Sequence, residues 1–467
     1  MSFHFLFKSL FILLSILATT TTDQNTSDKL LFVFTMFRHG ARSPFLSKDS
    51  TDIFGEQWQS SSQLTDIGIR QQYLLGKYNR IRYNSFLSPE YSPSEVVAFS
   101  TQWNRTLHSG NAHLQGLYPN IQSTKMSQER INKAIPPLSS ITDLTEAITD
   151  LNDYPLPNGL QLIPITVTPV INLLRFYQTC PNSLNVLSKN EKHETIVNAI
   201  NTFNTKYGDK LLSLLNITDK KYFSKYKNVV SLCDAFMAGY TDGRAFNSLK
   251  SPDQSLQIDL AELNATAFDI MQLDNNVYFS GDHELNKAFS GGVLRTILTY
   301  ISRRVNNDKQ SNYAYSDTDP KMVMFSVHDY DLSSLFMLIK EIFEVNLGTF
   351  YMSYASMLSF EVRYKGNNVY VVDLLRNGEL LMQKEFDVFE KVINTKLFSD
   401  TEYNVFCHGV KNVNIVEHAI VYSGVMGWSV STWIAIVLGV VVLAESFIIY
   451  RNYKREKYIK KEETFFD

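Results

Sequence analysis

The chain has 467 residues, of which 44% are hydrophobic and 19% are charged, and its formal net charge is −3. This length and apolar content support a large core, in one big domain or in one domain with an elaborated insertion. The near-neutral charge argues against a nucleic-acid partner, because such proteins neutralise phosphates with an excess of Lys and Arg.

The N-terminus is typical of a secretory signal peptide. Lys8 is followed by a short apolar run that ends in small residues at Ala18, which is the layout of a cleaved leader. We expect residues 1–22 to be removed, with cleavage between Ala18 and Asp23. An ordinary N-terminal helix is the alternative, but the threonines at 19–22 offer it no continuation.

An apolar run and a charged turn follow the leader. Residues 30–36 have the length and composition of a strand buried on both faces, as in a parallel sheet. The run leads into Arg38-His39-Gly40-Ala41-Arg42-Ser43-Pro44, and open α/β sheets place their chemistry beyond such strand ends. Two guanidiniums beside an imidazole repel a metal cation but match phosphate oxygens in a bidentate fork. The alternative is a surface loop with solvated charges.

A helix and a second strand come next. Leu64, Ile67, Leu74, Tyr78 and Ile81 share one helical face, so we expect a helix that packs through this face.

The apolar run 96–101 predicts a second buried strand, and Arg105 stands just past it at the start of a helix. A helix N-terminus favours anions. A solvated Arg at a helix start is an equally ordinary interpretation.

The middle of the chain carries no residue that we single out as functional. Residues 121–160 are polar and weakly periodic, which indicates a surface excursion. Periodicity and turn residues predict the remaining elements: a strand at 162–167, a helical cap from 182 to about 280, a helix from Phe289 to about Arg304, and a β-hairpin of strands 357–364 and 369–375.

A third apolar run, 322–327, ends at His328-Asp329. A satisfied pair in the core is the alternative for these two residues. The three strands would nevertheless deliver three guanidiniums, two imidazoles and a carboxyl group to one edge of the sheet. A phosphomonoester needs its oxygens neutralised, an attacking group in line, and a proton for the leaving alkoxide. Arginines, a histidine and an aspartic acid meet these needs in turn.

The C-terminal region predicts a membrane anchor. Residues 428–450 are nearly all apolar and long enough to span a bilayer, with Glu445 as the one charge. The tail 451–467 that follows is rich in Lys and Arg, and positive flanks stay in the cytoplasm. We therefore expect a single-pass type I membrane protein, with a buried globular helix as the alternative.

The cysteines and glycosylation sequons agree with a luminal body. The three cysteines, an odd number, allow one disulfide and one free thiol in an oxidising compartment. Sequons occur at Asn25, Asn104, Asn216 and Asn264. We expect glycans at Asn25, Asn216 and Asn264, whereas Asn104 lies too close to Arg105.

These motifs resemble the histidine acid phosphatases, in the acid-phosphatase and phytase branch of the histidine phosphatase superfamily. The resemblance runs from about residue 31 to Cys407, and the signal-anchored type I layout looks like the lysosomal acid phosphatase subgroup. The matching motifs occur in the same order: Arg-His-Gly-Ala-Arg-Ser-Pro at 38–44, Leu-Thr-x-x-Gly at 64–68, Ser-Thr-x-x-x-Arg-Thr at 100–106, Gly-Leu-Tyr-Pro at 116–119, Pro-Ile at 164–165, Cys-Pro at 180–181 and His-Asp at 328–329.

The resemblance implies an α/β fold, a mostly parallel sheet flanked by helices with an inserted helical cap. It implies that His39 is the nucleophile, forming a phosphohistidine, and that Asp329 is the proton donor. The implied phosphate ligands are Arg38, Arg42, Arg105 and His328. It also implies a disulfide between Cys180 and Cys407, which leaves Cys233 free, and no metal or other cofactor.

The sequence departs from the family pattern beside these residues. Gln102 and Asn104 stand where the family has Asp, and the loss of two carboxylates is expected to loosen Arg105. Tyr330 stands where the family has Thr, which is expected to alter the pocket wall.

We therefore predict an acid phosphatase that acts on small phosphate monoesters. Two alternatives stay open: a lipid- or inositol-phosphate phosphatase with the same residues, and a catalytically silent receptor ectodomain on this fold. A homodimer is an open alternative for the assembly. The expected location is luminal or extracellular, in a lysosome or phagosome or at the cell surface.

The expected layout begins with a signal peptide at 1–22. A phosphatase domain follows at 23–425, with its core at about 30–120 and 285–408 and its cap at about 182–280. A transmembrane helix at 428–450 and a cytoplasmic tail at 451–467 complete the chain.

Overall fold

The computed structural model describes residues 28–45, 58, 60–119, 125–136, 144–160, 162–167, 179–348 and 351–409. All of them belong to one compact unit, Met1–Asn414. The predicted signal peptide, the predicted membrane span and Asn25 lie outside the described residues. Within those residues, no helix combines the length and the apolar character that crossing a membrane requires.

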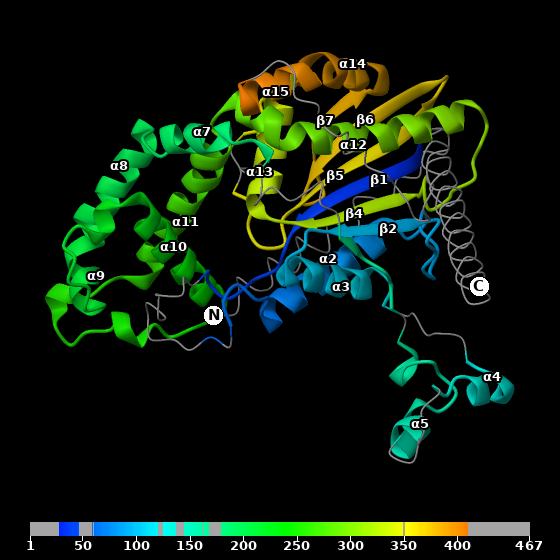
Figure 1. Cartoon of the computed structure of the whole chain (residues 1–467), viewed down its shortest axis with the longest axis horizontal. Coiled ribbons are helices and arrows are strands. Elements are labelled where there is room, and N and C mark those ends of the chain that lie inside the picture. The colour runs from blue at the N-terminus through cyan, green and yellow to red at the C-terminus, as the bar shows by residue number, and fades with distance from the viewer. Residues whose placement is uncertain are drawn as a thin grey trace, which may run out of the picture. The chain divides into compact units, whose positions relative to one another are not determined.

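A seven-stranded sheet forms the centre of the described fold (Figure 1). Its strand order is β3-β2-β4-β1-β5-β6-β7. In chain order the strands are β1 (Lys29–Arg38), β2 (Val96–Ser100), β3 (Thr166–Val167), β4 (Met322–Val327), β5 (Met357–Gly366), β6 (Val369–Arg376) and β7 (Glu379–Glu385).

The sheet is mixed, so the prediction of a mostly parallel sheet was wrong. Strands β3, β2, β4 and β1 pair in parallel, whereas β5, β6 and β7 are antiparallel. The β5–β6 hairpin was predicted, but β7 was not. Asn377 and Gly378 both have positive φ, 50° and 91°, at the turn into β7. An Asn-Gly pair is the usual signal for such a turn, and it is present in the sequence.

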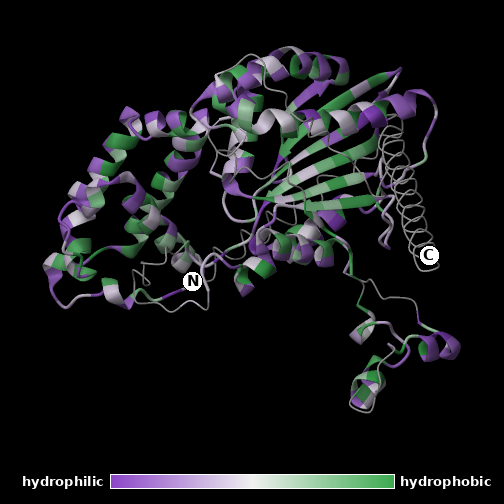
Figure 2. Ribbon diagram, in the orientation of Figure 1, coloured by the Kyte–Doolittle hydropathy of each residue, from purple (hydrophilic) through white to green (hydrophobic). Residues whose placement is uncertain are grey.

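Helices cover both faces of the sheet (Figure 1). One face packs against α2 (Asp66–Arg82) and α3 (Asn104–Leu117), and Val33, Ala98 and Met324 join Leu114 in one buried cluster. On the other face, Phe32 and Phe34 contact Tyr300 of α12 (His283–Lys309). Both faces of strands β1 and β4 are therefore buried, and Figure 2 shows these strands as mainly hydrophobic.

The remaining helices on that second face are α12 (His283–Lys309), α13 (Asp329–Ile342), α14 (Phe386–Lys396) and α15 (Asp400–His408). Helix α12 begins before the predicted start at Phe289, because the Asp282 side chain accepts a hydrogen bond from Leu285 N and caps it. A disulfide joins Cys180 to Cys407, the pair that the resemblance implies, and Cys233 is a buried free cysteine.

The region between Asn182 and Phe279 is helical and has a hydrophobic cluster of its own, to which Leu211, Phe223, Phe236 and Leu263 contribute. Its helices are α7 (Asn182–Asn190), α8 (Glu194–Phe203), α9 (Asp209–Leu214), α10 (Tyr226–Thr241) and α11 (Leu260–Leu273), with one-turn π-helices at Asn204–Gly208 and Asp274–Phe279. We call this region the cap. Two short helices, α4 (Gln128–Lys133) and α5 (Thr145–Leu151), lie in the polar stretch before it and bury no residue.

Helix α2 packs through the face opposite to the predicted one. Its buried residues are Gly68, Gln72, Gly76, Asn79 and Arg80. By contrast, Leu74 and Ile81 are 53% and 71% exposed.

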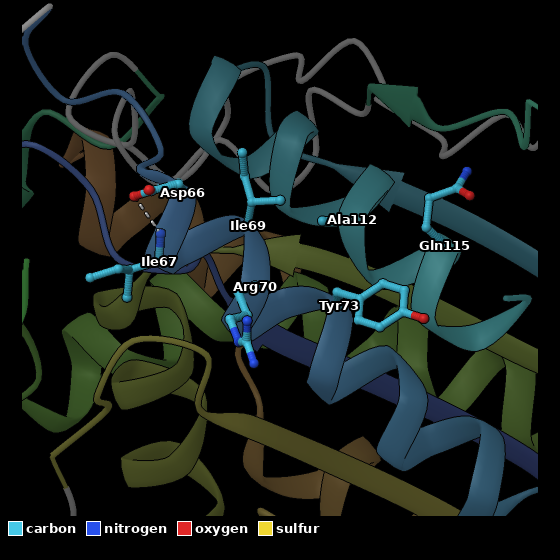
Figure 3. A pocket seen from close by; sticks show the side chains of 7 residues that line it. All are labelled: Asp66, Ile67, Ile69, Arg70, Tyr73, Ala112 and Gln115. Carbon is cyan, nitrogen blue, oxygen red and sulfur yellow. Dashed lines mark hydrogen bonds between the residues drawn. The ribbon is translucent and has the colours of Figure 1, made fainter.

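Close contact with α3 explains this reversal. A Cβ atom on Gly76 would lie 1.9 Å from the carbonyl oxygen of His113, so the backbones meet where a larger side chain would not fit. Most of the apolar stripe is left at the surface, and elsewhere α2 and α3 line a pocket of about 510 Å³ that includes only Ile67 of the stripe (Figure 3). The residues that line this pocket are Asp66, Ile67, Ile69, Arg70, Tyr73, Ala112 and Gln115, and none of the predicted site residues is among them.

Candidate active site

The three predicted site segments meet at the carboxyl ends of neighbouring parallel strands. Arg38, the last residue of β1, pairs with Val327, the last residue of β4. The backbone N–H of His39 donates to the carbonyl oxygen of Val327 at 2.9 Å, directly before His328. On the other side of β4, Ser100 of β2 pairs with Ser326. Register alone therefore brings the ends of β1, β4 and β2 together.

His39 is held in one tautomer. Its Nδ1 lies 2.8 Å from the carbonyl oxygen of Gly40, which can only accept, so Nδ1 carries the proton. Nε2 then carries the lone pair and has no hydrogen-bond partner among the described residues. Burial lowers the pKa of His39 well below its usual range, and the guanidiniums of Arg105 and Arg38 lower it further. The imidazole is therefore neutral and its Nε2 is available as a nucleophile.

The core holds Arg38 from two sides. Its Nη1 donates to the carbonyl oxygen of Met352 at 2.6 Å and to the hydroxyl of Tyr351 at 3.4 Å. Its Nη2 lies 2.7 Å from Oδ2 of Asp329. The ring of Tyr354 lies over the guanidinium, with its centroid 4.3 Å from the central carbon. Arg38 is thus buried and fixed by β1, the start of α13 and the segment before β5.

The cap holds Arg42. Nη1 and Nη2 donate to Oδ2 and Oδ1 of Asp234 at 3.1 and 2.8 Å. Asp234 lies on α10 and also accepts a hydrogen bond from the backbone N–H of Phe45 at 3.1 Å. Sequence reasoning missed Asp234, because no motif marks a single carboxylate within a helix of the cap.

Neutral partners hold Arg105. Its Nη1 donates to the hydroxyl of Ser62 at 3.0 Å, and its Nη2 donates to Nδ1 of His328 at 3.3 Å. The Nε2 of His328 then donates to the hydroxyl of Thr101 at 3.1 Å. Burial and Arg105 lower the pKa of His328 well below its usual range, so this imidazole is also neutral. Both of its ring nitrogens have protein partners.

The departures from the family pattern have visible consequences. Gln102 and Asn104 are exposed, and Trp103 packs its ring 5.1 Å from the Arg105 guanidinium. Ser62 and His328 hold Arg105 in the absence of the two carboxylates. The ring of Tyr330 stacks on His328 at a centroid distance of 5.3 Å and an angle of 17°.

The three guanidiniums share a pattern. In each, the two Nη atoms have protein partners, while Nε is buried and has no hydrogen-bond partner among the described residues. This alone is not diagnostic, since Nε of the distant Arg304 is also unpartnered. A more informative feature is the charge balance: among the described residues, Arg38 and Arg42 are ion-paired with Asp329 and Asp234, whereas Arg105 has only neutral hydrogen-bond partners. The surplus positive charge beside a neutral imidazole suits an anionic ligand. Among the described residues, no group of three His, Cys, Asp or Glu could hold a metal ion.

Polar residues of α2 and α3 hold the loop that carries His39, and two of them, Gln72 and Ser109, are buried. Gln72 donates from Nε2 to the carbonyl oxygen of Arg38 at 2.7 Å, and Gln71 accepts from the backbone N–H of Ala41 at 2.9 Å. The hydroxyl of Ser109 accepts from the N–H of Gly40 at 3.1 Å. Sequence reasoning missed these residues as well. The spacing of Gly68, Gln72 and Gly76 on one helical face was the available signal.

The chain is similar in sequence to known proteins. The family model described as histidine phosphatase superfamily, branch 2, matches residues 29–375. Testicular acid phosphatase of Mus musculus is 30% identical over 315 residues, 66% of this chain and 62% of that protein. The chain therefore spans less than two thirds of that relative. Lysosomal acid phosphatase of Rattus norvegicus is 27% identical over 352 residues, 74% of this chain and 70% of that protein. Among solved structures, the phytase from Citrobacter braakii has a TM-score of 0.48 at 15% identity and covers 79% of this chain and 98% of its own.

Proposed function

Because the chain belongs to branch 2 of the histidine phosphatase superfamily, we propose that it hydrolyses phosphate monoesters through a phosphohistidine intermediate. One observation carries the proposal: three buried guanidiniums, of which only Arg38 and Arg42 are ion-paired among the described residues, act electrostatically on a neutral His39 whose Nε2 has no hydrogen-bond partner among those residues. A phosphate group would neutralise the surplus charge. The protein would then hold its substrate by the part that all monoesters share.

In the first step, Nε2 of His39 attacks phosphorus, and the bond from phosphorus to the ester oxygen breaks. The departing oxygen takes the proton of the Asp329 carboxyl group and leaves as an alcohol. In the second step, water attacks the phosphohistidine and gives its proton to the Asp329 carboxylate. Phosphate leaves, and His39 is again neutral.

This cycle favours acidic solution. A carboxylic acid can donate only while it is protonated, so the first step is expected to accelerate as the pH falls. Protonation of His39 would end the reaction, but burial and the guanidiniums lower the pKa of His39 and so move that limit to a more acidic pH. The expected profile is therefore bell-shaped with an acidic optimum.

The alternatives are less well supported. Three relatives that match over more than 300 residues are named as acid phosphatases, and this favours neither a lipid- or inositol-phosphate phosphatase nor a silent receptor. A silent receptor also has no need of a neutral histidine among three guanidiniums.

We further propose the type I arrangement, with residues 23–425 luminal or extracellular, an anchor at 428–450 and a cytoplasmic tail. The proposal rests on the apolar runs at both ends of the sequence and on the basic tail. Alkaline carbonate should leave the full-length protein on membranes. Its release into the wash would show that the anchor assignment is wrong.

Replacement of His39 by Ala tests the proposed function. We expect the wild-type full chain to hydrolyse a panel of phosphomonoesters in the presence of EDTA. The variant should lose all turnover and should yield no labelled phosphoenzyme after acid quenching. Thermal unfolding of both proteins controls for loss of fold. Full activity of the variant would end the proposal.

A further inference from the structure

The three guanidiniums of the site are held from two different parts of the molecule. Residues of the core hold two of them: Asp329 and Met352 bind Arg38, and Ser62 and His328 bind Arg105. Arg42 is held by Asp234, a residue of the cap helix α10. Among the described contacts of these guanidiniums, this is the ion pair that links the cap to the proposed phosphate site.

The geometry of the pair leaves a defined edge of Arg42 open. A guanidinium has five N–H bonds, arranged so that two different edges can each bind an oxyanion in a bidentate fork. Asp234 takes the end-on edge, formed by Nη1 and Nη2. The carbonyl oxygen of Ser43 takes a further hydrogen bond from Nη1 at 3.0 Å. The side-on edge, formed by Nε and the second proton of Nη2, is left for a ligand.

Asp234 is rigidly placed. Its neighbours Cys233 and Phe236 on α10 are completely buried in the cluster of the cap. Its Oδ2 is shared between Arg42 and the backbone N–H of Phe45, so it also fixes the end of the loop that carries His39. Burial alone would raise the pKa of Asp234, but Arg42 outweighs burial and the pKa is lowered. The carboxylate is therefore charged in the mildly acidic solution in which the enzyme is expected to work.

We propose that Asp234 is a positioning residue, which turns the side-on edge of Arg42 toward the phosphate and makes phosphate binding depend on the cap. The inference rests on the proposed function. Asp234 acts through Arg42 and does not itself touch the substrate. Core contacts alone would therefore hold two of the three guanidiniums, and the cap would complete the site.

The substitution Asp234→Asn separates this role from simple electrostatics. Removal of a negative charge beside an anion site would, by charge alone, tighten the binding of phosphate. Loss of the fork has the opposite effect, because an amide NH₂ group faces one Nη of Arg42 and the guanidinium is no longer oriented. We expect the inhibition constant of inorganic phosphate and the KM for p-nitrophenyl phosphate to rise about tenfold, with a smaller change in kcat. All values are measured on the full chain at one pH.

Asp319→Asn is the matched control. Asp319 forms a buried ion pair with Arg304 at 3.0 Å, but it precedes β4 at the opposite end of the sheet. This variant should lose thermal stability, while its KM and its inhibition by phosphate should equal those of the wild type. Equal kinetic changes in both variants would mean that any lost ion pair has this effect, and would overturn the proposal.

A double-mutant cycle with Arg42→Gln makes the test specific. If Asp234 acts through Arg42, adding Asp234→Asn to the Arg42→Gln variant should raise the inhibition constant of phosphate no further. Additive effects, or an unchanged or lowered constant in Asp234→Asn alone, would overturn the proposal. If Asp234→Asn does not fold, the variant Asp234→Glu decides, because it keeps the charge but displaces the carboxylate fork by one methylene. The inhibition constant of phosphate should then rise by less than tenfold. An inhibition constant equal to that of the wild type would overturn the proposal.

The proposed function and this inference fail in different ways. If the wild-type chain neither hydrolyses p-nitrophenyl phosphate nor binds inorganic phosphate, the proposed function fails and takes the inference with it. If the wild type does both and Asp234→Asn binds phosphate as well as the wild type does, only the inference fails.

Discussion

The two ends of the parallel strands differ in how their buried charges are balanced. At the amino ends, protein groups satisfy the described charges: Glu95 lies 2.6 Å from Lys321, Arg304 lies 3.0 Å from Asp319, and Arg80 donates to four backbone carbonyl oxygens. At the carboxyl ends, two of the three guanidiniums are ion-paired among the described residues, and Arg105 has only neutral hydrogen-bond partners there. Unpaired buried charge is costly. The carboxyl ends thus retain charge that a ligand can neutralise, whereas the amino ends use charge to hold the fold.

The largest effect is expected when the proposed proton donor at the carboxyl ends is removed. Asp329→Ala should slow the hydrolysis of alkyl phosphates about 10²–10⁴-fold, the usual range for general acid catalysis. The loss on p-nitrophenyl phosphate should be much smaller, because its leaving group needs little protonation. The ratio of kcat/KM on the two substrates is the measurement. Equal losses would remove Asp329 from the acid role.

A charge removed at the amino ends should have the reverse signature. Glu95 accepts hydrogen bonds from the backbone N–H and the hydroxyl of Ser88 as well as from Lys321. Glu95→Gln should therefore lower the free energy of unfolding by about 2 kcal/mol at neutral pH, with kcat/KM unchanged. Chemical denaturation and steady-state kinetics check the two parts. A large loss of activity in a stable variant would contradict the division between the two ends.

A buried neutral histidine makes the stability of the fold depend on pH. His113 of α3 stacks on Phe37 at 4.3 Å, one residue before Arg38, and burial lowers its pKa to about 3. Below pH 6.5 the unfolded chain binds a proton at this residue and the folded chain does not, so stability falls as the pH falls from 6.5 toward 3. By pH 5 this costs about 2 kcal/mol.

The variant His113→Gln cannot titrate at this position. The contacts removed by this substitution are missing at both pH values. Between pH 7 and pH 5 the free energy of unfolding of the variant should therefore fall by about 2 kcal/mol less than that of the wild type. Denaturation curves at the two pH values supply the difference. Parallel losses in both proteins would mean that His113 is not the responsible group.

The smallest expected effect concerns the glycans. Asn216 is exposed in a turn with φ of 53°, whereas Asn264 lies within α11 with its amide oxygen buried. Asn104 begins α3 beside Arg105 at the carboxyl ends. We expect a glycan at Asn216 in preference to both, and Asn216→Gln should remove it without altering kcat or KM. Glycopeptide mass spectrometry gives the occupancy of each sequon. A glycan on Asn104 would contradict the proposal that substrate binds beside Arg105.

By itself, the sequence determined the strands that carry the site. The runs at 30–36, 96–101 and 322–327 are mostly apolar and have the length of buried strands; His328 directly follows the last run, Arg38 ends the strand of the first, and Arg105 lies four residues past the second. Local pattern was sufficient because strand burial and strand ends are properties of a few consecutive residues. The same holds for the Asn377-Gly378 turn, whose signal was present and was overlooked.

Only the tertiary structure decided what surrounds those residues. Asp234 lies 192 positions from Arg42 along the chain, and Ser62 lies 43 positions from Arg105. No periodicity relates residues at such separations, because the contacts depend on how the cap and the helices pack. The reversed helix α2 has the same origin: Gly76 meets the backbone of α3 and Gln72 holds Arg38, so close packing and buried hydrogen bonds override an apolar stripe.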